Sequence, residues 1–441
     1  MIIVQLIAFL LMLSFYYKRQ YAKYLFMISV FFTGFYNIVD VSSSPVKNID
    51  FLNLSTIIVL LCDKVKYIAK SNLLRKITNI LLLFLFLSFL YTILFDKDTF
   101  GYAFKVFRGF FPLLLIFVVQ KIPQKQVEDF FQLYFYVAFC VGILFYLQML
   151  GVNILSGRVV EGFGNSRFQN YPPFCSFIIA YVYLSNAFSL MKKLFYMAFF
   201  FGMLILGQER GMIMGLAFGF VVYTICQKNF KRAVLLAFVG GCAYFAIQPM
   251  LAKRSEQGNG GMLSDIQAAF SLKNSYDFEA GSFAFRTAML MERAEYLNSH
   301  PGDALLGVGM IHEESNHNKF SFRLGTMNSS FKYGRCMIES NDIAWCPILL
   351  RFGYIGVMLF FLYLLIIVMA CNSLIKSCDN KNVYLDSIMI YMISVLILTF
   401  NAGYFERIHE ISMLAIFVGY LISIKNDEKV NNLFKLEQAR H

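Results

Sequence analysis

The sequence predicts a polytopic α-helical membrane protein. Hydrophobic residues make up 58% of the 441-residue chain, charged residues only 15%, and the mean hydropathy is +0.60. Soluble domains are closer to half apolar and a quarter charged. Long apolar stretches recur from one end of the chain to the other, matching the roughly 20 residues that a membrane-spanning helix needs. A transmembrane barrel would instead show alternating strands of about ten residues.

The positive charges are distributed as topology signals. Although the net charge is +12, most Lys and Arg residues lie in short tracts between apolar stretches, which argues against a nucleic-acid partner. The positive-inside rule makes these tracts cytoplasmic, with the N-terminus outside, the C-terminus inside and about 13 spans, or 12 if residues 1–16 lie in the membrane interface. The tracts are Lys18/Arg19/Lys23, Lys64 to Lys76, Lys121/Lys125, Lys192/Lys193, Lys228 to Arg232, Lys376/Lys381 and the tail from Lys425.

One connection is much longer than the others. Residues 250–344 are mixed in polarity and are expected on the extracytoplasmic side, so they divide the chain into an N-terminal bundle (1–249), this outer loop, and C-terminal helices with a cytoplasmic tail (345–441). In the loop, "SFAFRTAMLMERAEYLNSHPG" predicts a helix that begins near a Ser and ends at a Pro. Arg286 and Arg293 lie two turns apart and share one face of it. A solvated face is the alternative to a site, and is favoured for Arg293.

The stretch "LGQERGMIMG" places charge inside an apolar region. Since cytoplasmic tracts flank it on both sides, residues 194–226 are expected to form a hairpin with its tip near Arg210. The first arm, 194–207, spans about 21 Å at 1.5 Å per residue, short of a ~30 Å hydrocarbon core. The tip is therefore expected below the outer surface, in a cavity lined by protein.

The second arm of this hairpin begins at the charged tip. Gly211, Gly215 and Gly219 follow in GxxxGxxxG spacing, which favours close packing on a neighbouring helix. The positive end of the arm and Arg210 point at the same place, which predicts an anion site. The alternative is an Arg210 that only snorkels to the lipid headgroups.

Three further arginines are weaker candidates. Arg108 in "FKVFRGFF" lies within an expected span, where a packing role and a site role are equally compatible with the sequence. Arg158 and Arg167 flank "VVEGFGNS" in another outer loop, and either bind lipid phosphate or belong to ordinary loop structure.

Signals for a metal or cofactor are weak. The nine cysteines form no CxxC pair and no Cys/His cluster. Asp96 and Asp98 form a D-x-D pair of the kind found in some metal-using glycosyltransferases, but such pairs are common in loops. His312 and His317 have no further ligands at zinc spacing. We therefore expect neither a metal nor a cofactor.

Four segments occur in the order and on the membrane side typical of one superfamily. They are "GRVVEGFGNSRFQNYPPF", "GQERGMIMG", "FRTAMLMERAEYLNSHPGDALLGVGM" and "ESNDIAWCPILLRFGYIGVMLFF". Over residues 150–360 the chain thereby resembles the O-antigen polymerase and ligase superfamily of bacterial surface-polysaccharide assembly. It departs from the family pattern at Glu209, because the family has a Ser before the Arg–Gly pair. It departs again at Asp342, where the ligases usually carry a His. The second departure favours a polymerase.

The resemblance implies a metal-independent glycosyltransferase of the bacterial inner membrane. Such an enzyme moves a glycan from a polyprenyl-diphosphate carrier to the sugar of another lipid-linked repeat unit, with its active site facing the periplasm, and membrane lipids and a chain-length regulator protein are expected partners. The runner-up is a ligase that transfers the glycan to lipid A–core. A flippase of lipid-linked glycans is the rival from another class, although such transporters usually show internal repeats.

The resemblance and the charge pattern together suggest roles for individual residues. Arg210 and Arg286 are expected to converge on the carrier diphosphate, and Asp342 is the expected general base with Glu339 in reserve. The remaining expected substrate-binding residues are Arg158, Arg167, Arg293, His300 and Arg108.

Two cysteines, Cys336 and Cys346, lie in or beside the outer loop. In an oxidising compartment they could form a disulfide next to Asp342, unless Cys346 lies too deep in the following helix to reach.

We predict that Asp342→Asn abolishes long chains if Asp342 is the base. Asp342 is expected in the first turn of the helix that follows the loop, where an ordinary N-cap is the competing role. Asn caps a helix about as well as Asp but cannot accept a proton, so the substitution separates the two roles. Chain length on a gel of surface polysaccharide is the measurement. Normal chain length and rate would move the search for the base to Glu339, Glu161 or His300.

Overall fold

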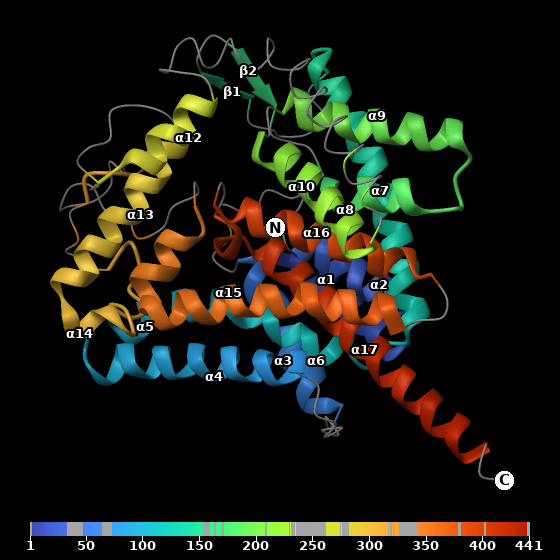
Figure 1. The fold of residues 1–441 in the computed structure, drawn as a ribbon. Helices are drawn as coiled ribbons and strands as arrows, with labels where there is room; N and C mark the ends of the chain where they lie inside the picture. Colours follow the sequence, from blue (N-terminus) through green and yellow to red (C-terminus); the bar gives the residue numbers. More distant parts are fainter. Residues whose placement is uncertain are drawn as a thin grey trace.

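The computed structural model is built almost entirely of helices (Figure 1). It describes residues 2–32, 47–63, 73–152, 159–162, 165–168, 172–207, 210–228, 230, 234, 262–273, 275, 282–315, 317, 320, 322–325, 338, 343–377, 381–400 and 403–438. Within these ranges the β-structure is one antiparallel hairpin, β1 (Val159–Gly162) and β2 (Asn165–Phe168).

The helices of the first half are α1 (Ile2–Tyr17), α2 (Tyr21–Phe26), η1 (Met27–Phe32), α3 (Asn48–Cys62), α4 (Leu73–Leu94), α5 (Phe100–Phe107), η2 (Arg108–Leu114), α6 (Leu115–Val119), α7 (Gln124–Met149), α8 (Cys175–Leu184), α9 (Leu190–Leu206) and α10 (Arg210–Cys226). Those of the second half are α12 (Met262–Ser271), α13 (Ser282–Ser299), α14 (Pro301–Ala304), α15 (Trp345–Ser377), α16 (Val383–Leu398), η4 (Tyr404–Glu406) and α17 (Ile408–Gln438).

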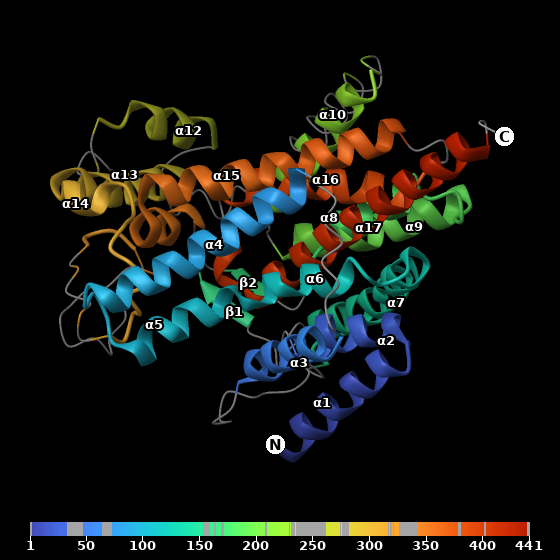
Figure 2. The ribbon, with the colours of Figure 1, turned by 90° about the horizontal axis from the view of Figure 1, so that it is seen from below.

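The apolar stretches form helices of membrane-spanning character. Among the described residues, four helical segments are long and apolar enough to cross a membrane: 73–94, 100–119, 124–149 and 345–377. Six shorter apolar helices accompany them. Figure 2 shows α4, α15 and α17 running side by side, with α12, α13 and α14 gathered at one end of the bundle. The helical fold class is thus confirmed in its coarse form, whereas the number of spans and their orientation stay predictions.

The interhelical polar contacts sort the helix ends into two groups. At one end, the Tyr420 hydroxyl donates to Glu128 Oε1 at 2.8 Å, and the Asn382 amide donates to the same oxygen at 3.3 Å. At the other end, Lys97 Nζ in the α4–α5 turn lies 2.9 Å from Asp303 Oδ1 of α14. The charge pattern assigns the first group to the cytoplasmic side and the second to the outer side. The fold therefore brings together helix ends that the sequence assigns to the same side.

Helix α10 packs tightly on α16. A Cβ added to Gly215 would lie 2.9 Å from the Ser394 carbonyl oxygen, and one added to Gly219 would lie 2.7 Å from the Ile390 carbonyl oxygen. The close packing predicted from the glycine spacing is therefore confirmed at these two positions. The pairing runs antiparallel, so the Arg210 end of α10 lies toward the end of α16.

The predicted turn before α10 is also present. Helix α9 ends at Leu206 and α10 begins at Arg210, as the flanking basic tracts indicated. The two arms do not form a closely packed hairpin, because the main neighbour of α10 is α16 and not α9. The glycine face of α10 explains this, since it matches the backbone of α16.

Helix α15 is broken near its start, at Gly353, which has φ 62° and ψ −165°. The break removes the helical donors of two carbonyl groups, and the segment after α14 replaces them. Val308 N donates to Leu350 O at 2.9 Å, and Gly309 N donates to Arg351 O at 3.1 Å. In an apolar environment such backbone groups must find partners within the protein. The segment that follows α14 therefore completes the hydrogen bonding of α15.

Glycines make this contact possible. Gly307 and Gly353 both have positive φ, and a Cβ at either position would collide with backbone atoms of the opposite segment. Ile355 N closes the same contact by donating to Leu305 O at 3.2 Å. The stretches "HPGDALLGVGM" and "GYIG", which belong to two of the four segments quoted from the sequence, thus pack against each other.

We predict that Gly353→Ala strongly destabilises the protein. A left-handed conformation costs a non-glycine residue about 1–2 kcal/mol, and the clash with the 305–307 backbone adds to this. The midpoint of thermal unfolding in detergent is the measurement, with Gly302→Ala as control because a Cβ there meets nothing within 4 Å. Equal midpoints for the two variants would contradict the proposed contact.

Candidate functional site at the end of α16

The starts of four helices lie against the second half of α16. Helix α8 runs antiparallel to it, since Tyr181 stacks on Tyr384 and Phe174 packs on Tyr391. Helix α15 begins beside its end, where Trp345 Nε1 donates to Thr399 Oγ1 at 3.1 Å. Helix α10 is antiparallel as described above, and α17 begins after the short turn that follows α16. We call this end, formed by the starts of α8, α10, α15 and α17, the helix-start cluster.

The helix-start cluster favours a negatively charged ligand. The first N–H groups of a helix have no intrahelical acceptor, and the helix dipole adds a partial positive charge. A helix start is therefore a place where an anion binds favourably, the more so with a cationic residue beside it. Arg210 is the first residue of α10 and so belongs to the cluster, although its side chain lies outside the described residues, as do Gln208 and Glu209.

A polar network is buried beside the helix-start cluster. The Tyr391 hydroxyl of α16 donates to Glu410 Oε2 at 3.1 Å and lies 3.4 Å from the Tyr404 hydroxyl. His409 Nε2 lies 3.5 Å from Glu410 Oε1, and the Phe174 ring packs against the His409 ring. The side chains of His409 and Glu410 retain 25% and 12% of their accessible surface. The network is therefore mostly buried but reachable.

Helix α13 confirms the predicted loop helix, and it places its two arginines differently. Arg286 is half-buried, whereas Arg293 is fully buried at 0% exposure. Arg293 Nη1 donates to Met289 O at 3.1 Å, and Nη2 donates to Leu324 O at 2.9 Å. Its guanidinium also lies 4.2 Å from the centre of the Phe322 ring. The expectation of a solvated face is wrong for Arg293, because the segment 322–325 folds over it.

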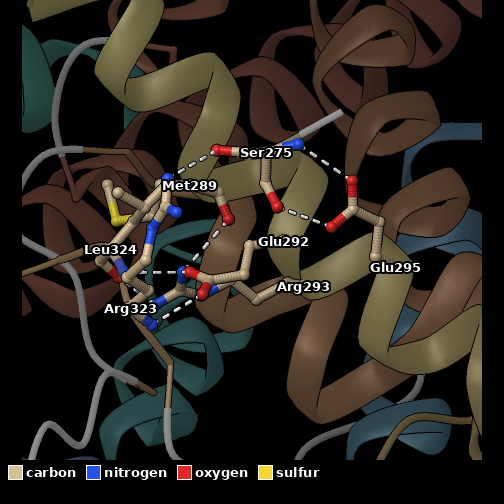
Figure 3. A network of polar contacts seen from close by, with 7 residues as sticks. All are labelled: Ser275, Met289, Glu292, Arg293, Glu295, Arg323 and Leu324. Atoms are coloured by element: carbon tan, nitrogen blue, oxygen red, sulfur yellow. Dashed lines mark hydrogen bonds and ion pairs between the residues drawn. The ribbon is translucent and has the colours of Figure 1, made fainter. Parts of the chain in front are cut away.

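Figure 3 shows how Arg293 joins a wider network. Glu292 Oε2 accepts from Arg293 Nη1 at 2.9 Å and from Leu324 N at 3.0 Å, while Glu292 Oε1 accepts from Arg323 N at 2.6 Å. Ser275 binds Glu295 through both its N–H and its hydroxyl. Burial lowers the pKa of the Arg293 guanidinium from its usual value. These contacts give Arg293 a role in holding the outer loop on α13.

Arg108 and His300 have structural surroundings. Arg108 Nη1 lies 2.6 Å from Asp50 Oδ1, and the Arg108 carbonyl accepts from Asn53 Nδ2 at 3.1 Å. The arginine thus joins η2 to the start of α3. His300 is exposed and stacks on Tyr296 of α13, with the ring centres 4.3 Å apart. It lies directly before α14, at the edge of the loop.

The D-x-D pair forms part of a loop anchor. Both carboxylate oxygens of Asp98 are used: Oδ1 accepts from Thr99 N at 2.7 Å and Ser315 Oγ at 2.5 Å, and Oδ2 accepts from His312 N at 3.0 Å. His317 Nδ1 lies 3.7 Å from Oδ1. The buried carboxylate therefore ties the α4–α5 turn to the segment 312–317.

Several expected site residues cannot be placed. Asp342, Glu339, Cys336 and Arg158 lie outside the described residues, and so the roles given to them stay predictions. Arg167 lies in β2 opposite Val160 of β1, with its side chain undescribed. Cys346 is buried in the first turn of α15. Because Cys336 lies outside the described residues, the disulfide between the two also stays a prediction.

Neither the Glu410 network nor Arg351 is among the site residues expected from the sequence. Glu410 and His409 lie in "FERIHE", a charged group between two apolar stretches. The rule that drew attention to Arg210, that charge inside an apolar region is usually functional, applies equally here. Arg351 is buried in α15, where its Nε donates to Ile311 O at 3.2 Å.

We predict that Arg293→Ala destabilises the outer loop by about 3–5 kcal/mol, because it leaves two buried carbonyl groups and the Glu292 carboxylate without their cationic donor. Protease cleavage of the loop should become faster, and mass spectrometry of the fragments measures it. Glu314→Gln is the matched control, since its ion pair with Lys105 is exposed and such pairs contribute less than about 1 kcal/mol. Equal cleavage rates in the two variants would rule out the structural role of Arg293.

Comparison with known proteins does not assign the chain. No family model matches it, and no curated protein sequence matches it significantly.

Proposed function

We propose that the protein polymerises lipid-linked polysaccharide repeat units at the outer face of a bacterial inner membrane. In this proposal 12 or 13 helices cross the membrane, the basic tracts lie in the cytoplasm and the helix-start cluster faces the periplasm. The donor is a glycan on a polyprenyl diphosphate, and the acceptor is the terminal sugar of another lipid-linked unit. The observation that carries the proposal is the position of Arg210 at the start of α10, within the helix-start cluster.

The chemistry of the donor fits this position. When the glycosidic bond to the carrier breaks, negative charge accumulates on the lipid diphosphate. Fixed positive groups stabilise that charge without reorganising during the reaction. Four helix N-termini and an arginine supply such groups. The apolar surfaces of the surrounding helices suit the polyprenyl chain, which must remain in the lipid.

The outer loop provides a second partner for the diphosphate. Helix α13 packs against α15 and carries the half-buried Arg286. We propose that Arg286 approaches the same diphosphate as Arg210 when donor is bound. The Arg293 network holds α13 in place, and the backbone contact at Gly353 holds the segment after α14 to α15.

We predict that Arg210→Ala abolishes long chains while the protein still inserts. Loss of one arginine–phosphate contact in a partly desolvated site removes about 2–4 kcal/mol of transition-state stabilisation, or tens- to several-hundred-fold in rate. Arg210→Lys should restore little activity because the planar guanidinium is lost. Purified protein with labelled lipid-linked repeat units gives the measurement, as a ladder of products.

The same assay separates the alternatives. A flippase changes only the sidedness of the labelled lipid and makes no ladder. A ligase is distinguished in cells, because deletion of a polymerase gene leaves one repeat unit attached to the surface lipid whereas deletion of a ligase gene leaves none. Arg19→Ala, in an exposed turn at the other end of the bundle, is the control. Full-length polysaccharide from Arg210→Ala at normal expression would refute the role of Arg210.

A further inference from the structure

We propose that Glu410, in contact with His409, is the general base that accepts the proton of the acceptor hydroxyl. This inference rests on the proposed function and assigns it a proton acceptor that the sequence analysis did not identify. It takes the place of Asp342, the earlier candidate, which lies outside the described residues. Three features of Glu410 carry the assignment: how it is held, what it is paired with, and where it lies.

Glu410 is held in a way that orients one oxygen and leaves the other available. Oε2 accepts the hydrogen bond of the Tyr391 hydroxyl at 3.1 Å. Oε1 lies 3.5 Å from His409 Nε2, and both side chains keep some accessible surface. A base must keep a lone pair within reach of the substrate while its rotamer is held by its neighbours. The Tyr391 contact supplies the second condition, and the surface that the Glu410 side chain keeps accessible allows the first.

Glu410 lies in an apolar bundle, and its partners can relay a proton. Charged groups in such places usually pair with an opposite charge, as Asp50 does with Arg108. Among the described residues, Glu410 has no Lys or Arg partner, and its ionisable neighbours are Tyr391, Tyr404 and His409. An imidazole can take the proton onward from the carboxyl group, which a lysine or arginine cannot do at neutral pH.

Glu410 also lies close to the proposed phosphate site. Tyr391, which binds Glu410, is on the same turn of α16 as Ile390 and Ser394, the residues against which α10 packs. Arg210 is five residues before Gly215, and so lies about 7.5 Å along α10 beyond the Gly215–Ser394 contact, toward the end of α16. Neighbouring helix axes are about 8–10 Å apart. One substrate, with its diphosphate at Arg210 and its sugars beside it, therefore reaches both groups.

The step balances in atoms and charge. The acceptor hydroxyl oxygen forms a bond to the anomeric carbon of the donor sugar while the bond from that carbon to the phosphate oxygen breaks. The bonding electrons leave with the polyprenyl diphosphate. The hydroxyl proton passes to Glu410 Oε1 and from there to His409 or water. No metal, oxidant or further reactant takes part.

Glu410→Gln tests the assignment, because Gln keeps the size of the side chain and can still accept the Tyr391 hydrogen bond. We expect the turnover rate to fall roughly 100-fold or more, the usual contribution of a general base, with donor binding unchanged. Glu410→Asp should recover part of the rate, since it keeps a carboxylate at a longer reach. Turnover is measured from the product ladder of purified protein, and donor binding from labelled lipid-linked repeat units. Gln126→Ala, on a helix at the far end of the bundle, is the control for handling.

Each outcome separates this inference from the proposed function. A wild-type protein that makes no ladder contradicts the proposed function itself. A wild-type ladder together with normal turnover in Glu410→Gln overturns only the role of Glu410. Loss of donor binding in parallel with turnover also overturns it, because it indicates a structural role. If Glu410→Gln is not recovered as a monodisperse protein, Glu410→Asp decides, and unchanged turnover in that variant rejects the base.

Discussion

The backbone contact between the break of α15 and the segment after α14 is the constraint on which the rest of the arrangement depends. Gly353 turns the chain out of helical geometry and exposes the carbonyl groups of Leu350 and Arg351, which an apolar environment does not tolerate without donors. Val308 and Gly309 supply the donors. The outer loop is thereby joined to α15 through main-chain hydrogen bonds, so its position does not depend on side-chain packing alone.

This contact places the loop helices relative to the helix-start cluster. The first turns of α15, up to Gly353, lie between the backbone contact and the end of α16, where Trp345 binds Thr399. Helix α13 packs on α15, and Arg293 holds the following segment against α13. The loop and the helix starts therefore share α15 as a common support. A substitution at Gly353 is therefore expected to disturb both the outer loop and the helix starts.

The charged residues described above include two kinds. The buried Arg293 and the half-buried Arg108 have partners that occupy the guanidinium and give it a structural role. Glu410 has partners that orient it and an imidazole that can exchange a proton with it. Burial alone does not distinguish these cases. The identity of the partner does, because an arginine forms a fixed ion pair with a carboxylate, whereas an imidazole can exchange a proton with it.

The sequence by itself determined the features that depend on residues near each other in the chain. Hydropathy predicted the helices, and the flanking basic tracts predicted the turn before Arg210. The helical period between a Ser and a Pro predicted the loop helix, and the glycine spacing predicted the close packing at Gly215 and Gly219. Only the tertiary structure decided which charges are structural. The Arg293 guanidinium binds a carbonyl group 31 residues away, and Arg108 binds Asp50, 58 residues away. Tyr391 binds Glu410, which is 19 residues further along the chain. A helical period gives the face of a side chain but not the partner on another helix, because that partner is set by how the helices pack.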